Sequence, residues 1–168
     1  GTIPQGNIAN ASLGAVTALP SGMVSAPGLT LGKVLQIVNG TAASQVGVTA
    51  NNSADTGLSA SITPSATSSK ILIICNHGLF TKSAAQTYCT LSLMRGSSSI
   101  YGIGNAFYSE SDGQLRLPVL SFSFLDSPST TSATTYKTNI NCPAGSSGTI
   151  YSSFQNQQST IQLIEIGA

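Results

Sequence analysis

The feature that most constrains the fold is a series of short β-prone runs that begins at Lys33 and continues to the end of the chain. Val, Ile, Leu, Thr and aromatic residues fill these runs, and clusters of Gly, Ser, Asn and Pro separate them. No segment repeats its apolar residues with the period of a helix, and the pattern is typical of a β-sandwich or jelly roll. The expected strands are Lys33–Val38, Gln45–Ala50, Leu58–Thr63, Lys70–His77, Thr87–Arg95, Ser99–Ile103, Leu115–Leu125, Thr134–Cys142, Gly148–Phe154 and Thr160–Ile166.

Three of these runs indicate how their strands are covered. Ile71–Ile74 is apolar at every position, so we expect one face of this strand to meet the opposite sheet and the other to meet a second subunit or arm. Apolar residues and serines alternate in Leu120–Phe124, which predicts one buried face, and Pro118 predicts an edge, a bulge or a bend just before it. Ile161–Ile166 is apolar on both faces, so this strand is not expected at a solvated edge.

Residues 1–31 differ from the rest because they carry no charged residue and show no sustained periodicity. Three prolines exclude a long helix or strand there. Apolar residues still recur at short intervals, namely Ile3, Ile8, Leu13, Val16 and Leu19. We therefore expect residues 1–31 to form an extended arm that docks on a neighbouring chain, with a disordered tag as the alternative, and residues 32–168 to form a β-sandwich domain. The start of the chain also lacks the basic and apolar regions of an intact signal peptide.

The chain has very few charges: 7% of its residues, against about 25% in typical soluble domains. Hydroxyl and amide side chains fill the polar positions instead, and such a surface is suited to contact with other copies or a larger assembly. The six Lys and Arg are scattered singly and the net charge is +1, so no nucleic-acid partner is expected. The chain contains no apolar run of about 18 residues, so no membrane insertion is expected.

Three segments carry a family resemblance. Gly32–Val38 reads GKVLQIV, Ser61–Ile73 reads SITPSATSSKILI, and Glu165–Ile166 closes the last strand. These segments resemble a module common at the carboxyl ends of bacteriophage structural proteins, especially tail fibres of marine and cyanobacterial phages, and the resemblance covers most of residues 32–168. It implies a virion component, commonly homotrimeric, that is either a host-contacting fibre tip or a trimeric decoration on the capsid.

Residues that support catalysis or metal binding in other proteins are sparse. Cys75, Cys89 and Cys142 lack C-x-x-C spacing, and with one His in the chain they predict buried thiols rather than a zinc site. A disulfide between Cys75 and Cys89 is the alternative. No G-x-S-x-G or phosphate-loop motif is present, so we expect His77 to be structural, no cofactor or metal to be bound, and no enzymatic activity.

The segment Asn105–Gly113 is the candidate recognition surface, because it combines Phe107 and Tyr108 with the acids Glu110 and Asp112. Aromatic rings stack on sugar faces, and carboxylates accept hydrogen bonds from sugar hydroxyls. The alternative is that Phe107 and Tyr108 fill the core at a strand end. The two acids are also the only pair suited to glycoside hydrolysis or calcium, although a solvated loop fits them better.

These observations predict an all-β fold, an antiparallel β-sandwich of jelly-roll type with an extended N-terminal arm. The expected function is non-enzymatic: the host-recognising, glycan-binding tip of a homotrimeric phage tail fibre, located in the virion, with residues 1–31 contacting other virion proteins. One alternative is a trimeric capsid decoration or cement protein whose arm clamps the shell. Another is an enzyme that trims host polysaccharide.

Overall fold

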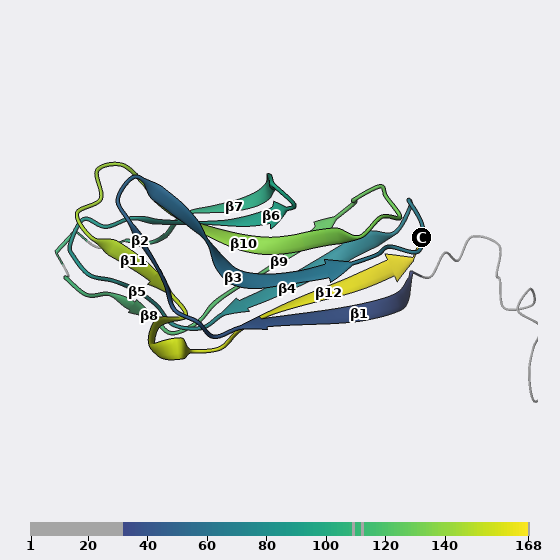
Figure 1. The fold of residues 1–168 in the computed structure, drawn as a ribbon, viewed down its shortest axis with the longest axis horizontal. Helices are drawn as coiled ribbons and strands as arrows, with labels where there is room; N and C mark the ends of the chain where they lie inside the picture. Colours follow the sequence, from purple (N-terminus) through teal and green to yellow (C-terminus); the bar gives the residue numbers. More distant parts are fainter. Residues whose placement is uncertain (1–31, 109, 112, 168) are drawn as a thin grey trace, which may run out of the picture. The chain divides into compact units, whose positions relative to one another are not determined.

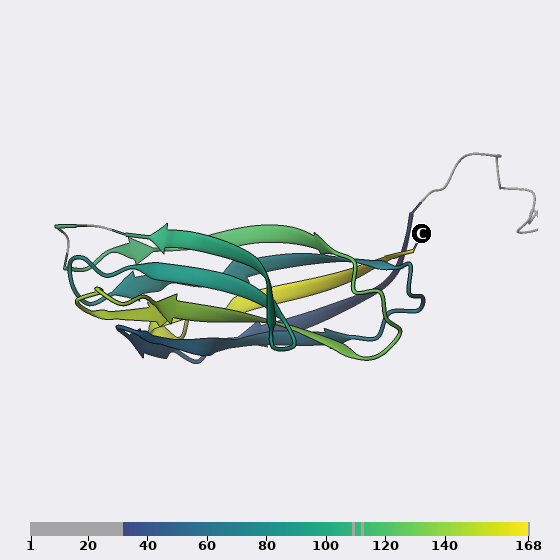
Figure 2. The same cartoon turned by 90° about the horizontal axis from the view of Figure 1, so that it is seen from above.

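The computed structural model describes residues 32–108, 110–111 and 113–167, and within them the chain forms antiparallel β-sheets and no α-helix (Figures 1 and 2). The predicted all-β antiparallel sandwich is therefore confirmed. The arm predicted for residues 1–31 lies outside the described residues.

The described strands form three four-stranded sheets. In the sheet β1-β12-β4-β9 the strands are Lys33–Ala42, Ser159–Gly167, Lys70–His77 and Leu120–Asp126. In the sheet β3-β10-β6-β7 they are Asn52–Ile62, Thr134–Cys142, Cys89–Arg95 and Ser98–Phe107. In the sheet β2-β11-β5-β8 they are Val46–Thr49, Thr149–Ser152, Phe80–Lys82 and Arg116–Leu117.

The third sheet continues the first. Each strand of the first sheet is followed or preceded in the chain by a strand of the third: β1 by β2, β4 by β5, β9 by β8 and β12 by β11. The strands of these four pairs occur in the same order across the two sheets. Gly78 lies at the second junction, Pro118 at the third, and Ser153 at the fourth with a left-handed backbone (φ 48°). The sandwich therefore has two layers, one of which is interrupted along a line that crosses all four of its strands (Figure 1).

Side chains between the layers form two core clusters. The first lies under β1, β12, β4 and β9 and contains Leu58, Ile62, Ile71, Ile73, Leu93, Tyr136, Ile161 and Leu163. The second lies under the third sheet and contains Val48, Phe80, Cys89, Leu91, Ile140, Cys142 and Ile150. The predicted placement of the last strand is confirmed, because Ile161 and Leu163 face the core and β12 lies between β1 and β4.

The single strand expected at Leu115–Leu125 is wrong. The chain forms β8 and β9 there, which pair with β5 and β4 in different sheets. Pro118 separates them, because proline has no amide hydrogen to donate to a sheet. Other expected strands have different limits: β3 begins earlier, at Asn52, and β7 continues to Phe107. The short strand β5 had not been predicted.

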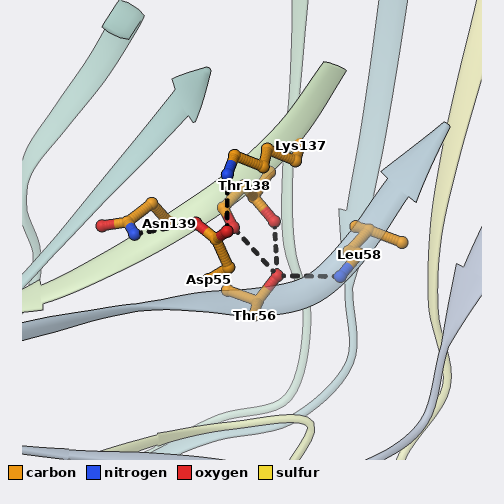
Figure 3. A network of polar contacts seen from close by, with 6 residues as sticks. All are labelled: Asp55, Thr56, Leu58, Lys137, Thr138 and Asn139. Carbon is orange, nitrogen blue, oxygen red and sulfur yellow. Dashed lines mark hydrogen bonds and ion pairs between the residues drawn. The ribbon is translucent and has the colours of Figure 1, made fainter. Parts of the chain in front are cut away.

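A β-bulge interrupts the pairing of β3 with β10 in the middle of both strands (Figure 3). The Thr56 hydroxyl accepts a hydrogen bond from the Leu58 amide at 3.2 Å, so the bulge leaves this buried donor satisfied. On the outer face, Asp55 accepts hydrogen bonds from Lys137 at 2.6 Å and from Asn139 at 3.0 Å. The bond from Asn139 and the charge and bond of Lys137 lower the pKa of Asp55. The outer face of this sheet is thus polar where it bends.

The three segments that carry the family resemblance meet at Glu165, whose side chain is fully buried. The carboxylate accepts hydrogen bonds from Gln36 Nε2 at 2.6 Å, from the Ser65 amide at 2.7 Å and from Ser65 Oγ at 2.8 Å. Burial alone raises the pKa of a carboxyl group, but these bonds favour the ionised form and lower the pKa of Glu165 to about 2. A buried charge held by β1 and by the turn before β4 gives these segments a shared structural role.

The three cysteines are buried in β4, β6 and β10, as predicted. All are free thiols, so Cys75 and Cys89 are not bridged. Burial raises the pKa of both thiols to about 12, which makes the reactive thiolate scarce at neutral pH. Among the described residues, no helix has the length and apolar character needed to cross a membrane.

Candidate recognition surface

The two ends of the sandwich differ in what they carry. At one end, Lys33 of β1 pairs with Gly167 of β12, so the described chain enters and leaves the sandwich there. At the other end lie β2, β11, β5 and β8 (Figure 1). This end also carries residues 83–88, 108–115 without 109 and 112, and 143–148, which we call the distal loops. The distal loops therefore lie far from both ends of the described chain.

Two tyrosines from different distal loops stack on one another. The ring centroids of Tyr88 and Tyr108 are 4.4 Å apart and the ring planes differ by 8°. The ammonium of Lys82, a buried residue of β5, lies 5.8 Å from the centre of the Tyr108 ring, within the range of a cation–π contact. Tyr88 thus covers one face of the Tyr108 ring, and both tyrosines remain partly exposed at this end of the sandwich.

Hydrogen bonds between two of the distal loops hold the loop of Tyr88 in place. The Tyr88 amide donates to Ser146 Oγ at 3.2 Å, and the Ser147 amide donates to the Gln86 carbonyl at 3.2 Å. At the base of the same loops, the Ser83 amide donates to the Thr149 carbonyl at 3.0 Å. The loop that carries Tyr88 is therefore braced by the loop between β10 and β11, which lowers the entropy lost when a ligand binds.

The electrostatics of the pair favour neutral, hydrogen-bonding phenols. A hydrogen bond with Tyr88, burial, and the negative charge of Glu110 all raise the pKa of Tyr108. Tyr108 therefore keeps its proton at any physiological pH. Its hydroxyl, together with the exposed Glu110 carboxylate, offers adjacent donors and acceptors of the kind that recognise vicinal hydroxyl groups.

The structure brings together part of the predicted site. Tyr108 and Glu110 belong to the same surface, whereas Phe107 is the last residue of β7, paired with Cys89, and not part of a loop. The Phe107 side chain and Asp112 lie outside what the structure describes. Sequence reasoning missed Tyr88 and Lys82. Tyr88 had been placed inside the expected strand Thr87–Arg95, whereas β6 begins at Cys89, and no local pattern links this isolated aromatic residue to a residue of the next loop.

His77 lies at the end of β4, near the line where the first and third sheets meet, and its side chain is 1% exposed. Its ring makes an edge contact with Phe80 at 5.2 Å between centroids. Neither ring nitrogen has a hydrogen-bond partner in the described part of the protein. Burial lowers the pKa of His77 to about 4, so the ring is neutral at neutral pH.

The loop Ser127–Ala133, which contains only small residues, hydroxyl-bearing except for one proline and one alanine, lies at the other end of the sandwich, between β9 and β10. It is separated from the tyrosine pair by the length of both strands. Within residues 32–108, 110–111 and 113–167, no group of three His, Cys, Asp or Glu side chains is arranged to hold a metal ion.

Comparison with models of known protein families and with curated proteins finds no match. The resemblance to phage fibre modules therefore stays a prediction from the residues that carry it.

Proposed function

We propose that this protein is a non-enzymatic virion component, the host-recognising tip of a homotrimeric phage tail fibre, and that it binds saccharide through the distal loops. The observation that carries the proposal is that the two ends of the sandwich differ. The described chain enters and leaves at one end, and the braced Tyr88–Tyr108 pair lies at the other. A fibre tip needs this arrangement, in which one end connects to the rest of the fibre and the opposite end carries the residues that contact the host.

The chemistry of the distal loops fits a neutral, hydroxyl-rich ligand. The tyrosine pair supplies apolar ring surface and hydroxyl groups, and Glu110 supplies an acceptor close by. Such a site is small and binds one sugar weakly. Three copies acting together on a repetitive surface glycan convert weak contacts into firm attachment, because the later contacts form at high effective concentration.

We also propose that the sandwich is a jelly roll. The strand orders β1-β12-β4-β9 and β3-β10-β6-β7 support this assignment. Apart from the hairpin of β6 and β7, strands that are neighbours in these two sheets come from distant parts of the sequence, and the chain passes repeatedly between the layers, as in a double Greek key.

Adsorption of the purified protein to a panel of cyanobacterial cells, and binding to their extracted surface polysaccharide, tests the function. Tyr108→Ala is expected to weaken adsorption by about tenfold or more, equivalent to about 1.4 kcal/mol. Tyr108→Phe keeps the ring and should lose less. Thr131→Ala, an exposed hydroxyl at the opposite end of the sandwich, is the matched control and should adsorb normally.

Two results would contradict the proposal. Normal adsorption by a correctly folded Tyr108→Ala protein would remove the distal loops from recognition. Release of reducing sugar from the polysaccharide, lost in Glu110→Gln, would make the protein an enzyme. Labelling of the protein on intact particles distinguishes a fibre tip from a capsid decoration.

A further inference from the structure

The two outer faces of the sandwich differ at one end. Antiparallel sheets that face water normally place apolar residues inward and polar residues outward. The outer face of β3 and β10 follows this rule, with Ser53, Asp55, Ser59, Ser61, Thr135, Lys137, Asn139 and Asn141. The outer face of β1, β12, β4 and β9 follows it in the half that carries Thr41, Thr160, Asn76 and Ser121, and departs from it in the half nearer the pair of Lys33 with Gly167.

An apolar row crosses all four strands of this second face. Ile37 of β1 pairs with Ile164 of β12, Ile164 pairs with Leu72 of β4, and Leu72 pairs with Leu125 of β9. Neighbouring strands of this sheet are seen in Figure 1. Ile37 is 57% exposed and Leu125 48%. Of the six large exposed apolar residues in the described chain, four belong to β1 and β9, namely Val34, Leu35, Ile37 and Leu125.

No charged side chain belongs to this row. Glu165 and Asp126 are buried, and Asp126 bonds to Arg95 and Tyr136 of the opposite layer. The exposed Lys33 and Lys70 lie at the end of the sheet, where they pair with Gly167 and Ile166 and not with residues of the row. An uncharged apolar row is complementary to another uncharged apolar row, and the chain supplies one in every copy.

The width of the sheet matches closure by three copies. Four strands spaced about 4.8 Å apart span about 14 to 19 Å. Three such sheets arranged as the sides of a triangular prism lie about 4 to 5.5 Å from the central axis. One sheet contributes a side-chain layer of about 5 Å, half of the roughly 10 Å between packed sheets, so three such layers fill the prism without a channel, and at the level of the row the side chains that meet are apolar.

We infer that the outer face of β1, β12, β4 and β9 is the contact between copies of this chain, which assemble about a threefold axis with these faces inward. This inference rests on the trimer of the proposed function and names its contact. Because β1 and β9 are opposite edges of the sheet, Ile37 of one copy meets Leu125 of the next. Such a head-to-tail contact closes into a ring when each copy is rotated by one third of a turn.

Light scattering at micromolar concentration gives the first test. The wild-type protein should have three times the 17.0 kDa mass of one chain, and Ile37→Arg should reduce it to a single chain with an unchanged circular dichroism spectrum. Ser53→Arg places the same charge on the other outer face and should remain trimeric. A folded Ile37→Arg trimer would overturn the assigned face and leave the proposed trimer intact.

Cysteine cross-linking provides a second test that does not depend on a disruptive charge. In a protein with both Ile37→Cys and Leu125→Cys, oxidation by glutathione disulfide should give a covalent trimer on a non-reducing gel, whereas either single variant should not. The native cysteines are buried and do not compete. A covalent dimer alone would refute threefold closure, and no cross-link in a trimeric protein would refute the face. A monomeric wild-type protein would instead refute the trimer of the proposed function, while glycan binding is decided separately by Tyr108→Ala.

Discussion

Lowering the pH from neutral to 4.5 is expected to destabilise the protein through His77, the one histidine of the chain. Burial lowers the pKa of His77 from 6.5 to about 4 in the folded protein. Below pH 6.5 the unfolded chain therefore binds a proton that the folded chain does not, and folding loses about 1.4 kcal/mol for each pH unit. By pH 4.5 the loss is about 3 kcal/mol, a large part of the roughly 5–15 kcal/mol of a typical domain.

The pH window isolates this residue. Glu165, with a pKa lowered from 4.5 to about 2, stabilises the folded state fully above pH 4.5 and loses its contribution only as the pH falls further. Urea unfolding followed by circular dichroism, at one protein concentration and several pH values between 7 and 4.5, measures the slope. His77→Leu removes the titrating ring and should make the stability nearly independent of pH in this range. An equal slope in the wild-type and His77→Leu proteins would refute the reasoning.

Two further predictions concern close packing and the buried carboxylate. Gly40→Ala places a Cβ against the Ser59 carbonyl oxygen, so thermal melting should show that the free energy of unfolding falls by about 1–3 kcal/mol or more. Gly104→Ala is the control, because no atom lies within 4 Å of the new Cβ, and this variant should melt normally. Glu165→Gln leaves the donors of Gln36 and Ser65 facing an amide, so urea unfolding at neutral pH should show a loss of about 1–3 kcal/mol. The variant should also lose the wild-type fall in stability between pH 4.5 and 2, and retention of that fall would contradict the assigned role.

The sequence predicted how two of the strands are covered. Leu120–Phe124 was assigned its buried face because alternation along a strand records directly which side chains enter the core. Ile161–Ile166 was placed away from a solvated edge because it is apolar on both faces. The first half of β3, Asn52–Gly57, was missed because its polar residues are held in the sheet by pairing with β10 and not by their own preference. The interruption at Pro118 was expected, but its result, a change of sheet, depends on which strands lie beside it.

In the candidate site, too, residues that are close in the sequence could be predicted, and residues that only the fold brings together could not. Tyr108 and Glu110 could be selected because an aromatic residue and an acid lie close together in a chain that has few of either. Tyr88 joins them only because the loops that precede β6 and follow β7 meet at one end of the sandwich. Ser146, which accepts the hydrogen bond from the Tyr88 amide, belongs to a third loop, and one serine among many gives no signal in the sequence.

The position of β12 makes the first sheet depend on a strand that is synthesised late. It is the last of the described strands to be made, yet it lies between β1 and β4. A nascent chain that stops before Ser159 leaves the facing edges of β1 and β4 unpaired, and unpaired edges recruit other strands. Such a chain also lacks Ile164, so its apolar row is broken between Ile37 and Leu72. In the proposed trimer, such a molecule would offer its neighbours an incomplete contact face.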